Sequence, residues 1–453
     1  MASSPIPALK VLEQSPISPP NGSVPESTIP LSFSDLMWLY MGNVERIFFY
    51  SIPAISTSHF VEHLLPSLKT SLSLTLQHFF PLAGHFIFSP NSDSKYHYHY
   101  NDGDSISFTV AESDADFTHL AGDDARSVLE LQSLVPVLAA VSADATSLMA
   151  VQVTVFPSQG ICLGLTISHG ACDGTSTANF LKSWAATCKS GATSAVLSTT
   201  PLFDRSLFVY PIELDAIYLQ FAMKMRELRS VTTTDHDLAK TDMVIASFWL
   251  TRDQVEKLKR WISEEKVAFH CSTFVVACAY VWTCLVRARG SSINQVAWMG
   301  CPVNARGRLR PPVPEGYFGN CLGSCLANAE VGELVKEDGL RAAAEVLGRA
   351  IDGLGDGVLR DAHVWPEMGK IFMDRRPLTV AGSPGFRFYD IDFGWGRPVK
   401  VEVVSLRNNG AMSISEGKDG GGGGIGIGLA APKMEMERFS FEFANGLQFL
   451  NSF

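Results

Sequence analysis

Residues 161–186, ICLGLTISHGACDGTSTANFLKSWAA, decide how this chain is organised. They begin as an apolar run of β-type residues and end in a helical pattern that places Phe180 and Trp184 on one face. His169 lies where the strand ends, and Asp173 follows just before the helix. Loops between rigid elements often carry reactive groups, and imidazole exchanges protons near neutral pH. This loop is therefore the candidate site.

The composition indicates a globular protein. Of the 453 residues, 46% are hydrophobic and 18% are charged, and the length suffices for two or three domains. The net charge of -10 argues against nucleic acid or an anionic membrane as the main partner. The longest nearly apolar run, 274–286, is shorter than the ~20 residues of a membrane-spanning helix. The start, MASSPIPALK, has no secretory pattern, and nine cysteines without CxxC pairs favour buried thiols in the cytosol.

Strand and helix patterns alternate along the whole chain, which predicts an α/β protein with two mixed-sheet domains. We expect strands at 47–52, 96–100, 149–156, 161–168, 243–250, 295–303, 386–393, 399–406 and 425–430. We expect helices at 61–80, from the His169 loop to about 188, and at 252–262, 272–287, 331–354 and 434–447. The alternating YHYHY at 96–100 predicts a strand and no metal site, because its histidines have no acidic or cysteine partner nearby. The Ser-, Thr-, Ala- and Gly-rich residues 189–207 are the best linker candidate.

The four-residue spacing of His169 and Asp173 indicates a functional site only because an apolar strand precedes it and a helix follows it. His119 and Asp123 have the same spacing in a polar stretch with no strand before them. No G-x-S-x-G string predicts a serine nucleophile, and no His and Cys cluster predicts a zinc site. From this stretch alone, a structural histidine at a strand end remains the stronger alternative.

A second unusual string, DFGWG at 392–396, changes this balance. Together with HGACDG it resembles the plant BAHD family of acyl-coenzyme A-dependent acyltransferases, whose signatures HxxxD and DFGWG occur in this order. The strings LSFSDLMWL, LKTSLSLTLQHFFPLAGH and STFVVACAYVW agree, so the resemblance covers essentially the whole chain. YFGNC at 317–321 is similar to the mark of the branch that acts on anthocyanins and other phenolic glycosides, often with malonyl-CoA.

The resemblance implies two similar-sized mixed-sheet domains of the chloramphenicol acetyltransferase-like fold, with the active site in a channel between them. We expect an N-terminal domain of 1–190 plus about 376–398, a crossover linker at 191–212, and a C-terminal domain of 213–375 plus 399–453. His169 would be the general base, and neither a covalent acyl-enzyme nor a metal is needed. A monomer is the family-based expectation.

The resemblance leaves two readings for each of three residues. Asp173 either orients the imidazole or turns away and pairs with Arg306, and we favour the pair because a charge beside a buried loop usually needs a partner. Asp392 is either a second acid or base or a structural residue. The indole N–H of Trp395 donates a hydrogen bond either to a group in the core or to the oxyanion. Structural places near the site are expected for Gly174, Gly394, Gly396 and Asn320.

For the coenzyme, Ser272 and Thr273 at a helix start offer donors to a phosphate, with Lys257 and Lys259 as nearby charges. A helix cap and a solvated helix face are equally good interpretations of these residues. The glycine-rich residues 420–428 lack the nucleotide-loop patterns, and we interpret their start as a hairpin turn.

Two departures from the family pattern affect the substrates. Thr175 stands where members that use malonyl-CoA often carry Lys or Arg, so a hydroxycinnamoyl-CoA donor is the alternative to malonyl-CoA. Asn304 replaces an acidic residue that is common in the family, so Asp173 and Arg306 are open to a different set of hydrogen-bond partners in this chain. A relative that binds phenolic glycosides without acyl transfer is a hypothesis of another class, and the intact His169, Gly174 and DFGWG argue against it.

Overall fold

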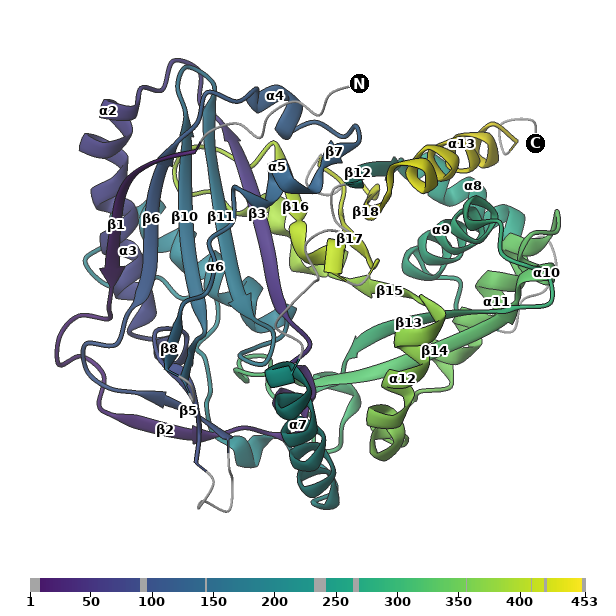
Figure 1. Cartoon of the computed structure of the whole chain (residues 1–453), viewed down its shortest axis with the longest axis horizontal. Coiled ribbons are helices and arrows are strands. Elements are labelled where there is room, and N and C mark those ends of the chain that lie inside the picture. The colour runs from purple at the N-terminus through teal and green to yellow at the C-terminus, as the bar shows by residue number, and fades with distance from the viewer. Residues whose placement is uncertain are drawn as a thin grey trace.

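The computed structural model describes residues 9–89, 96–142, 145–231, 242–263, 269–355, 357–408, 410–418 and 422–449. Within these residues the strands form sheets of six, seven and five strands. Figure 1 shows the two larger sheets side by side, the first half of the chain mostly around one and the second half mostly around the other. The predicted α/β class with two mixed sheets is confirmed.

The six-stranded sheet places the decisive stretch at its centre. In spatial order its strands are β1 (Lys10–Ile17), β6 (Ile106–Glu112), β10 (Met149–Phe156), β11 (Gly160–Ser168), β3 (Asn43–Ser51) and β16 (Lys400–Val403). Every residue of β10 and β11 is buried, which explains their continuous apolar sequence. The two strands, each predicted from the sequence, pair with each other as an antiparallel hairpin. Because β11 pairs with a strand on each side, its end is held firmly.

Helix α6 (Gly174–Ser190) follows β11 and packs on α3 (Leu65–Leu76) beside this sheet (Figure 1). Its predicted apolar face is fully buried at Phe180 and Trp184. The other helical segments of this half are α1 (Phe33–Trp38), α2 (Thr57–His59), a π-helical turn (Phe60–Leu64), α4 (Phe117–Leu120), α5 (Val128–Gln132) and a 3-10 turn (Phe80–Leu82). The predicted helix at 61–80 is therefore regular only within α3.

The five-stranded sheet contains the YHYHY string. Its order is β2 (Ser27–Pro30), β5 (Tyr96–Tyr100), β4 (His85–Phe88), β9 (Ala145–Ser147) and β8 (Ala140–Ser142). The tyrosines of β5 are buried and its histidines are partly exposed, as the alternation predicts. In the described part of the chain, no group of three or more His, Cys, Asp or Glu side chains is placed to hold a metal ion.

The seven-stranded sheet belongs mainly to the second half. Its order is β14 (Leu322–Glu330), β13 (Val296–Asn304), β15 (Leu378–Ala381), β17 (Met412–Glu416), β18 (Ile425–Pro432), β12 (Met243–Leu250) and β7 (Arg126–Ser127). The helices of this half are α7 (Glu213–Val231), α8 (Arg252–Ile262), α9 (Thr273–Arg289), α10 (Val331–Leu334), α11 (Gly339–Asp352), α12 (Trp365–Arg375) and α13 (Lys433–Phe449). Each helix within the described ranges is too short or too polar to cross a bilayer.

Two sequence-based predictions differ from this fold. The predicted strand at 386–393 is wrong, because the segment forms 3-10 turns at Pro384–Phe386 and Phe388–Asp390. Arg387 between them has a φ of 54°, a left-handed conformation that no strand contains. The predicted helix at 331–354 is divided into α10 and α11. Within 420–428, Ile425 begins β18, and residues 420 and 421 lie outside the described residues.

The sheets also cross the predicted domain boundaries. β16, assigned to the C-terminal domain, pairs with β3 in the six-stranded sheet. β15, assigned to the N-terminal domain with 376–398, pairs with β13 and β17 in the other large sheet, and β7 pairs with β12. These strands correct the boundaries of the prediction, and the division at 191–212 stays a prediction.

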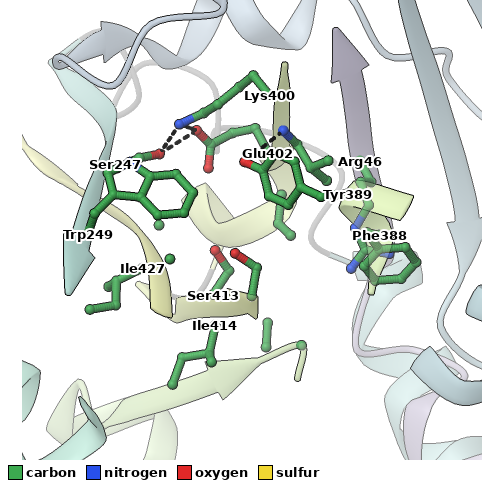
Figure 2. Close-up of a pocket in the computed structure, with 17 residues that line it drawn as sticks. Arg46, Ser247, Trp249, Phe388, Tyr389, Lys400, Glu402, Ser413, Ile414 and Ile427 are labelled. Carbon is green, nitrogen blue, oxygen red and sulfur yellow. Dashed lines mark hydrogen bonds and ion pairs between the residues drawn. The ribbon is translucent and has the colours of Figure 1, made fainter. Parts of the chain in front are cut away.

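A buried polar cluster lies where β16 meets the second sheet. Figure 2 shows Lys400 pointing toward Ser247 and Glu402 around a small pocket of about 30 Å³. Glu402 and Arg126 form an ion pair at 2.7 Å with both side chains buried, and Lys400 pairs with Asp123 at 2.7 Å. The cluster ties residues 400–403 to both large sheets.

Candidate active site

His169 begins the loop between β11 and α6, and two contacts fix this loop. The Tyr98 hydroxyl lies within hydrogen-bond distance of the carbonyls of Gly170 and Ala171, at 3.1 and 2.6 Å. A Cβ atom at Gly170 would lie 2.8 Å from the Cα of Leu39, so a larger residue does not fit. The backbone after His169 is therefore held between α1 and the small sheet.

The His169 imidazole forms part of the wall of a cavity of roughly 2310 Å³. It stacks on the indole of Trp38, with ring centroids 4.1 Å apart and planes inclined by 12°. Its buried Nδ1 atom has no hydrogen-bond partner among the described residues. Burial lowers the pKa of His169 below 6.5, although the negative charge of Asp173 opposes this shift. The ring is therefore neutral at neutral pH and able to accept a proton.

Asp173 turns away from the cavity and pairs with Arg306. The guanidinium lies 2.7 and 3.2 Å from the two carboxylate oxygens, and both side chains are fully buried. The same carboxylate caps α6 by accepting hydrogen bonds from the N–H groups of Thr175 and Ser176, and it also accepts one from Cys321. In the described structure none of its hydrogen bonds goes to His169. The geometry therefore contains the pair that we favoured from the sequence.

Asn304 and Asn320 complete the support of this loop. The side-chain Oδ1 of Asn304 accepts a hydrogen bond from the backbone N–H of Arg306 at 3.1 Å. Asn304 therefore contacts Arg306 from the position where family members commonly have an acidic residue. Asn320, in the YFGNC string, donates from Nδ2 to the His169 carbonyl at 3.0 Å and to Asp35 at 3.1 Å. Gly174 packs against the ring of Phe386, and both residues line the cavity.

Asp392 and Trp395 lie away from the described cavity wall, in keeping with the structural interpretation, and a catalytic part for either residue stays a prediction. Neither belongs to the described residues that line the cavity. Asp392 forms an ion pair with Lys189 at 2.7 Å and accepts hydrogen bonds from the N–H groups of Gly394 and Gly396 at 2.8 and 2.9 Å. Trp395 stacks on Phe393 with ring centroids 5.4 Å apart. DFGWG therefore closes a tight loop on the core, and both glycines have positive φ angles.

The residues expected at the coenzyme are divided between the cavity and the surface. Ser272 lines the cavity and caps α9 by accepting a hydrogen bond from the Val275 N–H at 3.2 Å. Thr273, Lys257 and Lys259 are not among the described residues of the cavity wall. Lys259 pairs with Glu256 at 2.9 Å on the same helix. The coenzyme contacts expected of these three residues stay a prediction.

The cavity wall contains features that the sequence reasoning missed. Trp38 is one of them, although it lies within the LSFSDLMWL string quoted above. An apolar and aromatic part of the wall comes from α1, α7 and the start of α12, with Met37, Trp38, Ile217, Phe221, Met225, Trp365 and Met368. Cations also line it, among them Lys182, Arg308 and Arg360. Such a cavity suits a large ligand that has aromatic and anionic parts.

Comparisons with known proteins show the family of this chain. Residues 9–445 match the Transferase family. Phenolic glucoside malonyltransferase 2 of Arabidopsis thaliana is 36% identical over 423 residues, 91% of this chain and 93% of the relative. Coumaroyl-CoA:anthocyanidin 3-O-glucoside-6''-O-coumaroyltransferase 1 of the same plant is 35% identical over 435 residues, covering 91% and 92%. Vinorine synthase has the same fold, with a TM-score of 0.67 and 21% identity over 97% of this chain and 98% of its own.

The chain belongs to the Transferase family, the BAHD acyltransferases, and is an acyl-CoA-dependent acyltransferase. The resemblance based on HGACDG and DFGWG is thereby confirmed. The two-domain fold implied by that resemblance is confirmed as well.

Proposed function

We propose that this enzyme transfers an acyl group, malonyl in the first place, from acyl-CoA to a hydroxyl group of a flavonoid, anthocyanin or other phenolic glycoside, with His169 as general base. The observation that carries the proposal is the partly buried, neutral imidazole on the wall of a cavity lined by both halves of the chain. A cytosolic monomer remains the expected form of the enzyme.

His169 takes the proton of the acceptor hydroxyl as its oxygen attacks the carbonyl carbon of the thioester. The tetrahedral oxyanion then collapses, the carbon–sulfur bond breaks, and the proton held by His169 passes to the sulfur, which leaves as the thiol of coenzyme A. A positioned base of this kind contributes about 10²–10⁴-fold to the rate. Orientation of both substrates and stabilisation of the oxyanion supply the rest.

Trp38 supplies the oxyanion donor in this proposal, in place of Trp395. Its indole Nε1 is buried, and the described residues offer it no hydrogen-bond partner. A buried donor without a partner is costly, and a substrate oxygen would satisfy it. The indole is stacked on the imidazole, so it lies directly beside the proposed base.

Two features of the cavity favour different acyl groups for the acyl-CoA substrate. Lys182, Arg308 and Arg360 give the free carboxylate of a malonyl group cationic partners. Thr175, on the wall beside Gly174, is smaller than the Lys or Arg of many malonyl-using members and leaves room for a hydroxycinnamoyl group. Relatives of both kinds exist at 35–36% identity. We keep malonyl as the proposal and hydroxycinnamoyl as its alternative.

The acceptor proposal rests on the apolar part of the wall. Phe221 and Trp365, with methionines around them, offer stacking and dispersion contacts to the aromatic ring of a phenolic aglycone. The names of the two relatives above refer to glucosides, which supports a sugar hydroxyl as the group that receives the acyl chain.

A competition assay tests the function. Purified enzyme receives equal malonyl-CoA and p-coumaroyl-CoA together with flavonoid and simple phenol glucosides, and the products are identified by mass spectrometry. His169→Ala is compared with His119→Ala as the matched control, since His119 has the same spacing to an aspartate but lies on the surface helix α4. We expect an acylated glucoside that disappears only in His169→Ala.

The products also decide between the alternatives. A malonylated product supports the proposal, and a coumaroylated product selects the alternative donor. If His169→Ala keeps the activity of the parent enzyme, the assignment of the general base is wrong. If glucosides bind but no acyl group is transferred from either donor, a binding role replaces the proposed reaction.

A further inference from the structure

Arg205 is a partly buried arginine in the expected crossover segment, within a 3-10 turn at Arg205–Leu207. Its Nη1 donates to the Phe318 carbonyl at 2.6 Å and to the Tyr317 hydroxyl at 2.9 Å. Its Nε donates to the Pro30 carbonyl at 3.1 Å. One side chain therefore joins the start of the YFGNC loop to the segment just before α1.

The same guanidinium neutralises Asp35, which is fully buried in α1. Its Nη2 lies 3.5 Å from Oδ2 of that carboxylate. The other oxygen, Oδ1, accepts hydrogen bonds from the backbone N–H and the side-chain Nδ2 of Asn320, at 2.8 and 3.1 Å. Nδ2 of Asn320 also lies 3.0 Å from the His169 carbonyl. A continuous chain of polar contacts thus runs from Arg205 to the backbone of His169.

A second route joins Arg205 to the same loop. The guanidinium lies over the ring of Tyr98, 5.3 Å from its centroid. The Tyr98 hydroxyl bonds to the carbonyls of Gly170 and Ala171, directly after His169. The carbonyls of residues 169–171 therefore accept hydrogen bonds from the side chains of Asn320 and Tyr98. Tyr98 contacts Arg205 directly, and Asn320 contacts it through Asp35.

We propose that Arg205 is a positioning residue, which sets the direction of the His169 imidazole through Asp35, Asn320 and Tyr98. The inference rests on the proposed role of His169 as general base. It assigns a function to the crossover segment, which belongs to neither large sheet and yet contacts the supports of the catalytic loop. Arg205 itself is not among the described residues of the cavity wall, so it acts only through other residues.

Removal of this guanidinium is expected to lower kcat and to leave substrate binding almost unchanged. Without Arg205, the carboxylate of Asp35 is left buried with fewer partners, and the Tyr317 hydroxyl and the Phe318 carbonyl lose their shared donor. A displacement of a catalytic group by about 1 Å is enough to cost about 10²-fold in rate. We therefore expect kcat of Arg205→Ala to fall by about 10- to 100-fold, with KM for both substrates changed by less than about threefold.

The decisive measurement is chemical rescue. The Arg205 side chain is 14% exposed, so a small cation is able to reach the space that Arg205→Ala leaves. Guanidinium chloride, far below denaturing concentrations, should restore kcat of Arg205→Ala at least severalfold, while sodium chloride at equal ionic strength should not. A role limited to stability predicts no such recovery in protein that is already folded.

Arg341→Ala is the matched control, because Arg341 also combines a hydrogen bond to a backbone carbonyl, that of Trp261, with a position over an aromatic ring. It is not among the described residues of the cavity wall. We expect this variant to lose stability without a specific loss of kcat. Circular dichroism and thermal unfolding of each variant show that the folded protein is being compared.

Three outcomes are informative. A low kcat that guanidinium restores supports the proposal. A kcat of folded Arg205→Ala within about twofold of the parent, a negligible free-energy difference, overturns it. The proposal is also overturned if guanidinium does not restore kcat of Arg205→Ala and Arg341→Ala has an equally low kcat. A general loss of stability then explains the low rate. The proposed role of His169 fails separately, if His169→Ala stays active.

Discussion

The imidazole of His169 lies parallel to the indole of Trp38, with ring centroids 4.1 Å apart and planes inclined by 12°. This contact fixes the ring of the proposed base on one side, and the neighbouring backbone is fixed by Asn320 and Tyr98. A base that is held in one orientation has less freedom to lose when the substrates bind.

Substitutions of Trp38 separate its two proposed roles. Trp38→Phe keeps an aromatic ring beside His169 but removes the N–H donor, whereas Trp38→Ala removes both. Loss of one oxyanion donor costs about 10²–10³-fold in kcat, so we expect Trp38→Phe to fall within that range and Trp38→Ala to fall further. Steady-state kinetics of the folded variants measure this. If Trp38→Phe keeps the kcat of the parent enzyme, the oxyanion donor is another group.

The pH dependence of kcat/KM reports the state of His169 in the free enzyme. Burial lowers the pKa of this imidazole below 6.5, and the base must be unprotonated to accept the hydroxyl proton. Activity is therefore present above the lowered pKa and is lost as the pH falls through it. We expect the acid limb of kcat/KM to have its midpoint below pH 6.5. An acid limb centred above pH 6.5 would contradict the assigned environment.

The pair of Asp173 and Arg306 is expected to matter for folding more than for chemistry. Arg306→Met leaves a fully buried carboxylate without its cation, which costs about 3–5 kcal/mol in the free energy of unfolding. Urea unfolding of Arg306→Met and of the parent enzyme measures this difference. Unfolding free energies that agree within error would show that the pair does not stabilise the loop.

Asp173→Asn tests the direct catalytic reading that we do not favour. The loss of a triad aspartate lowers kcat by about 10⁴-fold, because it holds the imidazole in the correct tautomer. Asp173 bonds to the start of α6, to Cys321 and to Arg306, so we expect a much smaller loss in folded protein. A loss of the full triad size would restore Asp173 as the residue that orients His169.

Asp392→Asn tests the structural interpretation of DFGWG. The carboxylate binds Lys189 and two backbone N–H groups of its own loop, so the substitution should lower the midpoint of thermal unfolding. Because Asp392 is outside the described cavity wall, kcat of the folded variant should remain within about threefold of the parent, a small free-energy difference. A loss of two orders of magnitude in kcat, without a change in stability, would place Asp392 in the chemistry.

Local pattern was sufficient to predict the elements around His169. The apolar run of β11 and the buried face of α6 are both determined by neighbours in sequence, and the structure contains each of them. The pair with Arg306 was implied by the family resemblance, and the cost of burying an unpartnered charge favoured it over the catalytic alternative. Local pattern alone does not indicate it, because the two residues are 133 positions apart.

The remaining features depend on residues that are far apart in sequence. At 386–393 the alternation of apolar residues resembles a strand, but Arg387 adopts a left-handed conformation and the chain turns instead. Trp38 and Arg205 reach the His169 loop only through tertiary packing, and nothing in their own segments indicates this. The sheet to which residues 400–403 belong is likewise decided by pairing with β3, more than 350 positions earlier.

The position of β16 bears on how this protein is made in the cell. Domains generally fold as units while the chain is being synthesised, starting from the N-terminus. Here β16, the strand that completes the first large sheet, is synthesised only after nearly nine-tenths of the chain. Until then one edge of β3 has no partner strand. An open strand edge is a template for pairing with other chains. We therefore expect chaperones to assist this protein during synthesis, and forms truncated before residue 400 to aggregate.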